Sequence, residues 1–79
     1  MKCRITRITE LDGVTPKSSH VKRIGVTGDL LLISVGYPMW IKYSDGHGTL
    51  MTSSIEEIGE DPKELTVKTH NAIYMLEKT

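Results

Sequence analysis

Hydrophobic and polar residues alternate along much of the chain, with the period of two that is typical of half-buried β-strands. Residues 65–69 place two apolar residues and a threonine on one face, and a threonine and a lysine on the other. Residues 72–76 form a second apolar run that predicts a strand pairing back on the first. The pair between them, His70-Asn71, is expected to form the turn, so the C-terminal part of the chain predicts a hairpin.

The N-terminal part predicts two more strands. Residues 2–11 begin with an alternation that slips by one position at Ile8, which indicates a β-bulge within this strand. Asp12-Gly13 is expected to end it. Residues 20–27 carry three apolar residues at strand-like positions and predict the second strand, and Gly28-Asp29 after them predicts a tight turn.

The next run, residues 30–35, is Leu-Leu-Leu-Ile-Ser-Val and is apolar on both faces. A strand of this kind left exposed would be prone to pair with other chains. It is therefore expected either to lie centrally beneath a second layer or to be covered by another subunit. Pro38 ends the run, because proline donates no backbone hydrogen bond to a ladder.

The middle of the chain predicts a hairpin, with strands over 40–43 and 49–53 joined by the turn-forming residues 44–48. The stretch 53–58 leaves two interpretations open. Its serines and glutamates match a capping box and favour one helical turn, but a strand with a bulge fits as well. An acidic loop is expected to follow over 59–64.

Composition supports a mostly β fold. β-Branched residues number 22 of 79, counting eight Ile, five Val and nine Thr, against a single Ala. Such residues fit a pleated sheet and lose side-chain freedom in a helix. We therefore expect one domain over residues 1–79, folded as a small antiparallel barrel or rolled sheet of about six to seven short strands, with at most one short helical turn.

A chain of this size builds only a small core, which usually needs a disulfide, a metal or further copies of the chain for stability. Cys3 is the only cysteine, so no bridge forms within the chain. His20, His47 and His70 lie far apart in the sequence and lack the spacing of a zinc site, so no metal is expected. A homo-oligomer is the expectation that remains.

The formal charges sum to zero, with ten basic and ten acidic residues, which argues against a general nucleic-acid binder. The two signs are unevenly distributed. Residues 1–23 hold six basic and two acidic side chains, whereas residues 42–79 hold four basic and seven acidic ones. No apolar run is long enough to span a membrane, and the first residues lack a signal-peptide pattern. The sequence therefore favours a cytoplasmic protein without membrane contact.

Sequence motifs for catalysis and for cofactor binding are missing. No G-x-S-x-G pattern surrounds a serine, and neither a P-loop nor a dinucleotide-binding glycine pattern occurs. Cys3 fits a small core residue, and His47 between two glycines fits the tip of a hairpin. We therefore expect a protein without enzyme activity and without a cofactor.

The remaining chemistry is capture of a small anionic ligand, because Arg and Lys bind phosphates through charged hydrogen bonds. Trp40 lies on the face opposite Ile41, where it suits stacking on a nucleobase or an interface, and it fits a second core layer equally well. Solvated strand positions are the alternative explanation for the cations. The expected phosphate, ribose and base contacts are Arg4, Arg7, Arg23, Trp40, Lys42, Asn71 and Tyr74.

Four segments carry a family resemblance: Gly36-Tyr37-Pro38, Tyr43-Ser44-Asp45-Gly46, Thr52-Ser53-Ser54-Ile55 and residues 67–76. Through them, about half of the chain resembles small β proteins encoded by phages and prophages of Gram-positive bacteria. Proteins of this kind include counter-defence proteins. Some form symmetric oligomers that sequester nucleotide-derived immune signals, as Thoeris-type sponges do, and others block a CRISPR effector directly.

The resemblance implies a non-catalytic counter-defence protein in the cytoplasm of an infected or lysogenic bacterial host. It would sequester a small anionic nucleotide-derived immune signal in a homo-oligomer. Two alternatives stay open. In one, the acidic stretch Glu56–Glu64 mimics nucleic acid and inhibits a host defence nuclease. In the other, the chain is a structural barrel of a virion or of its assembly.

Overall fold

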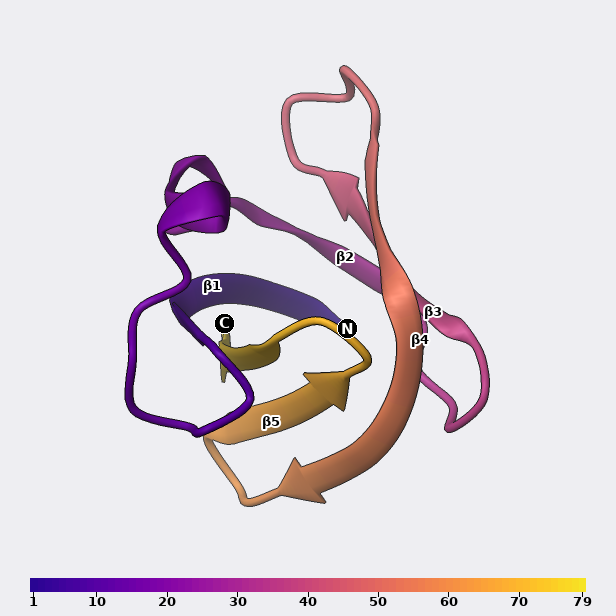
Figure 1. Cartoon of the computed structure of the whole chain (residues 1–79). Coiled ribbons are helices and arrows are strands. Elements are labelled where there is room, and N and C mark those ends of the chain that lie inside the picture. Colours follow the sequence, from indigo (N-terminus) through magenta and orange to yellow (C-terminus); the bar gives the residue numbers. More distant parts are fainter.

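In the computed structural model, residues 1–79 form a closed ring of six antiparallel strands with one short 3-10 helix (Figure 1). Each strand pairs with the next one along the chain, and the last pairs with the first. The predicted fold, a small antiparallel barrel with at most one helical turn, is confirmed. The elements in chain order are β1 (Lys2–Thr9), η1 (Ser18–Arg23), β2 (Thr27–Leu32), β3 (Pro38–Tyr43), β4 (Thr49–Glu60), β5 (Glu64–Thr69) and β6 (Ile73–Lys78).

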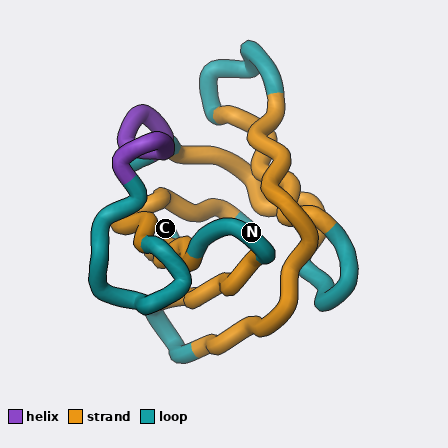
Figure 2. The backbone as a smooth tube through the Cα atoms, viewed as in Figure 1, coloured by secondary structure: helices purple, strands orange, loops and turns teal.

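The seam between β1 and β6 closes the ring. Its register runs from Cys3 opposite Lys78 to Thr9 opposite Ile73, and a bulge interrupts it after Ile5. The bulge that the slipped alternation predicts in the first strand is thereby confirmed. The two ends of the chain lie close together beside this seam (Figure 2).

β1 pairs with β2 only over its first residues, Lys2–Arg4. Beyond them the segment 17–26 runs alongside β1 in place of β2. The Lys17 amide donates to the carbonyl of Ile8 at 3.0 Å, and the Gly25 amide donates to the carbonyl of Ile5 at 2.7 Å. η1 arches outward between these two contacts. We call this interruption of the β1–β2 ladder by residues 17–26 the η1 gap.

The prediction of a strand over 20–27 is wrong. Most of this segment belongs to η1 or to the turn after it, and Val21 is 60% exposed, because the chain leaves the sheet and turns back at Gly25 with φ +88°. The predicted turn at Gly28-Asp29 is also wrong, since both residues lie within β2. A Cβ on Gly28 would overlap the carbonyl oxygen of Lys42 on β3, so this glycine permits a close approach of strands.

Two further boundaries differ from the sequence expectations. The helical turn considered for 53–58 is absent, and the alternative of a bulged strand is confirmed, because β4 runs through this stretch with its bulge between Ile55 and Glu57. The first half of β4 pairs with β3 and the second half with β5, so the strand curls around the ring (Figure 1). The first strand ends at Thr9, which leaves Leu11 exposed.

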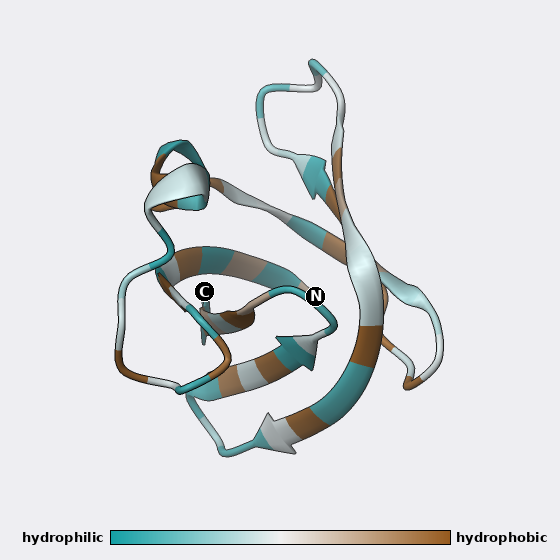
Figure 3. Cartoon of the chain, viewed as in Figure 1, coloured by the Kyte–Doolittle hydropathy of each residue, from teal (hydrophilic) through white to brown (hydrophobic).

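Side chains that point inward from every strand fill the ring. Figure 3 shows the alternation as bands of opposite hydropathy along β1 and β5. Barrels of about eight strands have interiors that side chains just fill, and this ring has only six strands. A ligand therefore finds no room inside. The buried hydrophobic residues are Cys3, Ile5, Ile8, Leu30, Met39, Ile41, Leu50, Ile55, Leu65, Val67, Ala72, Tyr74 and Leu76.

The apolar run 30–35 is only partly covered by the chain itself. Leu30 points into the core, but Leu31 and Leu32 are 58% and 41% exposed. The expectation of a second layer over this run is wrong, because the sheet forms a single closed ring with its core inside. Cover by another subunit stays a prediction.

Gly28→Ala is expected to lower the free energy of unfolding by about 1–3 kcal/mol, the usual cost of overpacking, because the added methyl group forces β2 and β3 apart. Gly59→Ala on β4 is the matched control. A Cβ there meets nothing closer than Thr66 at 3.9 Å, and the change should stay within about 0.5 kcal/mol. Urea unfolding measures both values. Equal stability of the two variants would contradict the close approach of Gly28 to Lys42.

Candidate functional site

Two of the seven residues predicted for ligand binding meet in the structure. The guanidinium Nη1 of Arg23 donates a hydrogen bond to the phenol oxygen of Tyr74 at 2.5 Å, although the residues are 51 positions apart in the chain. Tyr74 points inward from β6 and is buried, whereas Arg23 ends η1 and is half-buried. Their contact lies at the η1 gap and forms the centre of the candidate site.

The two arginines of β1 are engaged elsewhere. Arg4 forms a salt bridge with Glu77 on the adjacent β6, with 2.8 Å between nitrogen and oxygen. Arg7 donates to the carbonyl of Val14 at 3.1 Å and so supports the loop between β1 and η1. Both side chains are exposed, and the contacts that they make are those of ordinary outer-surface residues.

The three other predicted residues also lie apart from Arg23 and Tyr74. Trp40 and Lys42 flank the buried Ile41 on β3, so both point to the outside of the ring. Asn71 is exposed in the turn between β5 and β6. Of the seven predicted residues, only Arg23 and Tyr74 share a hydrogen bond.

η1 brings a further residue to this site. The helix is held by backbone hydrogen bonds between residues three apart, such as the one from the Ile24 amide to the Val21 carbonyl at 3.2 Å. Residues i and i+3 eclipse one another in a 3-10 helix, so His20 and Arg23 share one face. That face is turned toward β6, where the ring centroids of His20 and Tyr74 lie 6.3 Å apart.

The charge around Arg23 is one-sided. Residues 17–23 include two lysines and one arginine but no acidic residue. Lys17 is paired with Glu10 at 3.0 Å. The hydrogen-bond partner of Arg23, in contrast, is a phenol, and no carboxylate of the chain forms a salt bridge with it. The positive charge of this half-buried guanidinium is therefore uncompensated within the chain.

Tyr74 remains a neutral phenol at this position. Burial raises the pKa of its hydroxyl above the ordinary value of 10.0, while the charges of Arg23 and Lys17 act in the opposite direction. The neutral oxygen accepts the hydrogen bond from one guanidinium N–H. Arginine has five such donors in a planar fork, so the others remain available to the oxygen atoms of an anion.

The acidic stretch 56–64, proposed from the sequence as a mimic of nucleic acid, is partly engaged within the chain. Glu60 forms a salt bridge with Lys78 at 2.5 Å. Asp61 accepts hydrogen bonds from two backbone amides of its own turn, which lowers the pKa of its carboxyl. Both carboxylates remain exposed, so the nuclease-inhibitor hypothesis stays a prediction.

The role of His20 is not visible in the sequence pattern. A strand over 20–27 would place His20 and Arg23 on opposite faces, because side chains alternate along a strand. Only the 3-10 helix brings them to the same side. The one sequence signal that marks the segment is the absence of acidic residues from positions 17–23.

Comparisons of the chain with models of protein families, with curated proteins and with solved structures found no match. None of the helical segments has the length and apolar character needed to cross a membrane. No group of three or more His, Cys, Asp or Glu residues is arranged so that it could hold a metal ion. The support for a function therefore lies in the residues of this chain.

Tyr74→Phe is expected to lower the free energy of unfolding by about 1–3 kcal/mol at neutral pH, because it leaves the half-buried Arg23 guanidinium without its acceptor. Tyr37→Phe is the matched control. Tyr37 is 59% exposed and its hydroxyl makes no hydrogen bond within the chain, so its effect should stay within about 0.5 kcal/mol. Urea unfolding of the three proteins gives the comparison.

The effect of Tyr74→Phe should also depend on pH. The folded chain holds the phenol proton to higher pH than the unfolded chain, so the stability that this group contributes is complete below pH 10.0 and is lost as pH rises through the raised pKa. The difference in the free energy of unfolding between wild type and Tyr74→Phe should therefore narrow above that pH. Cys3, whose pKa is also raised by burial, is common to both proteins. A difference in unfolding free energy that does not change with pH would contradict the burial of the phenol.

Proposed function

We propose that this chain is a non-catalytic counter-defence protein of phage or prophage origin, which binds a small anionic nucleotide-derived immune signal in the cytoplasm of the bacterial host. The proposal combines the sequence resemblance with the cationic η1 gap. The observation that carries it is Arg23, a half-buried guanidinium that no carboxylate of the chain neutralises. An uncompensated charge in this position favours an external anion as its partner.

Tyr74 makes Arg23 suitable for capturing a ligand. The phenol is fixed in the wall of the barrel and holds one guanidinium nitrogen at 2.5 Å, which restricts an otherwise flexible side chain. A preorganised arginine loses less conformational entropy when an anion binds. The free N–H groups can then donate two parallel hydrogen bonds to a phosphate, a geometry that lysine cannot provide.

The proposed ligand binds at the outside of the ring, at the η1 gap, because the interior of the ring is filled. The His20 ring beside Tyr74 offers a stacking surface for a nucleobase. Ser18 and Ser19 on η1 offer hydroxyl groups for ribose or phosphate oxygens. A homo-oligomer, which the sequence resemblance implies, is also part of the proposal.

Arg23→Gln is expected to weaken the binding of ADP-ribose, used as a nucleotide-derived probe, by about 10- to 100-fold, which corresponds to the loss of one charged hydrogen-bonding group. Glutamine keeps an N–H donor while it removes the charge, and circular dichroism checks that the variant is folded. Arg4→Gln is the matched control, because Arg4 is paired with Glu77 on the outer surface and its loss should leave the affinity unchanged. Isothermal titration calorimetry measures all three proteins.

Inorganic phosphate should compete with ADP-ribose if the guanidinium recognises the phosphate groups. A wild-type chain that binds neither compound would contradict the proposal. Equal weakening by both arginine substitutions would also contradict it, because the effect would then belong to overall charge and not to the Arg23 site. In cells, the wild type but not Arg23→Gln is expected to suppress a defence system that depends on a nucleotide-derived signal.

A further inference from the structure

A group of exposed apolar side chains lies outside the ring on β2, β3, β4 and the loop between β2 and β3. Eleven large hydrophobic residues of the chain are exposed, and six of them fall between positions 31 and 51. A large contiguous apolar patch on a soluble protein usually marks an interaction surface. The six residues are Leu31, Leu32, Val35, Tyr37, Trp40 and Met51.

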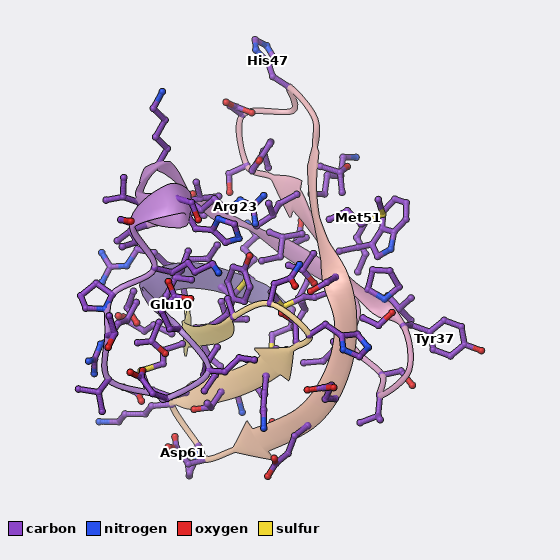
Figure 4. The ribbon with its side chains drawn as sticks, in the orientation of Figure 1. Glu10, Arg23, Tyr37, His47, Met51 and Asp61 are labelled. Atoms are coloured by element: carbon purple, nitrogen blue, oxygen red, sulfur yellow. The ribbon has the colours of Figure 1, made fainter.

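Three of these side chains form a row across the sheet. Leu32 on β2 is the register partner of Trp40 on β3, and Trp40 is the register partner of Met51 on β4. Partners of this kind are neighbours on the same face of a sheet. Figure 4 shows that Met51 and Tyr37 both project outward on the side of β3 and β4. We call Leu32, Trp40, Met51 and Tyr37 the apolar outer face.

We infer that the apolar outer face is the contact through which two copies of this chain form a symmetric dimer, with Trp40 as its anchor. This inference rests on the homo-oligomer in the proposed function and names its surface. The ring is closed, so free strand edges are limited to stretches such as the first half of β4, which pairs with β3 alone. Burial of the apolar outer face favours association face to face, and a two-fold contact brings the same patch of both copies together.

Charges beside the apolar outer face favour a second copy of the same chain over other partners. Asp29 on β2 and Lys42 on β3 are exposed register partners, and neither forms a salt bridge within the chain. A two-fold axis parallel to the strands, between β2 and β3, places Asp29 opposite Lys42 of the partner subunit. The same operation places Lys42 opposite Asp29 of the partner subunit, so the patch is complementary to itself.

The size of the patch also fits a dimer contact. Together with Leu31 and Val35 of the same segment, the apolar outer face leaves roughly 600 Å² of side chains with exposed fractions between 39% and 59%, which approaches the ~800 Å² per partner of a standard interface once polar rim residues are added. Tryptophan is among the residue types that contribute most to binding energy at interfaces. Trp40 lies in the middle of the row, between Leu32 and Met51, where such an anchor is expected.

Met51→Glu tests the dimer, because it places a charge in the apolar outer face at a position that is 54% exposed and outside the core. Sedimentation velocity over a concentration series is expected to show a dimer for the wild type and a dissociation constant raised about tenfold or more for Met51→Glu. Val14→Glu is the matched control, since Val14 is 69% exposed in the loop before η1 and its substitution should leave the constant unchanged.

Trp40 provides a second readout, because it is the only tryptophan of the chain. Its emission is expected to shift to longer wavelength when the wild type is diluted below the dissociation constant and water reaches the indole. This shift does not depend on the folding of any variant. A wild type that stays monomeric, or a dimer that Met51→Glu leaves intact, would overturn the inference.

Titration of the same proteins with ADP-ribose distinguishes this inference from the proposed function. A wild-type dimer that Met51→Glu disrupts, but that binds neither ADP-ribose nor phosphate, would remove the proposed function and support the interface. A wild-type monomer that binds ADP-ribose through Arg23 would overturn the interface and leave the anion site in place.

Discussion

The seam between β1 and β6 is the contact on which the rest of the structure depends. It turns a row of six strands, each paired with the next along the chain, into a ring, so that every strand has two neighbours and the inward side chains meet around one axis. The thirteen buried hydrophobic residues form one cluster because of this closure. An open sheet of the same strands would leave one apolar face without cover and two edges free to pair with other chains.

A ring that is both closed and filled leaves its outer surface as the place for a binding site. The η1 gap exists because β2 accompanies β1 only over Lys2–Arg4, and the segment that replaces it carries Arg23 to the buried phenol of Tyr74. The apolar outer face lies on β2, β3 and β4, where inward alternation necessarily turns Trp40 outward. The proposed anion site and the proposed dimer contact therefore use different side chains.

Alternation in the sequence was sufficient wherever a strand buries one face, as in residues 65–69, where Leu65, Val67 and Thr69 are all buried. It failed at Gly28-Asp29, a pair typical of turns, because Gly28 lies within β2 and permits the close approach of β2 to β3. The chemistry of their side chains was enough to predict Arg23 and Tyr74 as ligand-binding residues. Their contact, however, depends on η1, and the sequence pattern over 20–27 predicts a strand there instead. In both cases the structure depends on which strands pair and in which register, and this pairing between distant segments cannot be predicted from the local sequence.

Amide hydrogen exchange along the seam tests the closed ring most directly. In a ring no strand is an edge, so the amides that link β1 and β6 are expected to exchange as slowly as those that link β3 and β4. Fast exchange of the β1 and β6 amides, with slow exchange elsewhere in the sheet, would show an open sheet. That result would contradict the filled interior and, with it, the placement of both proposed sites on the outside of the ring.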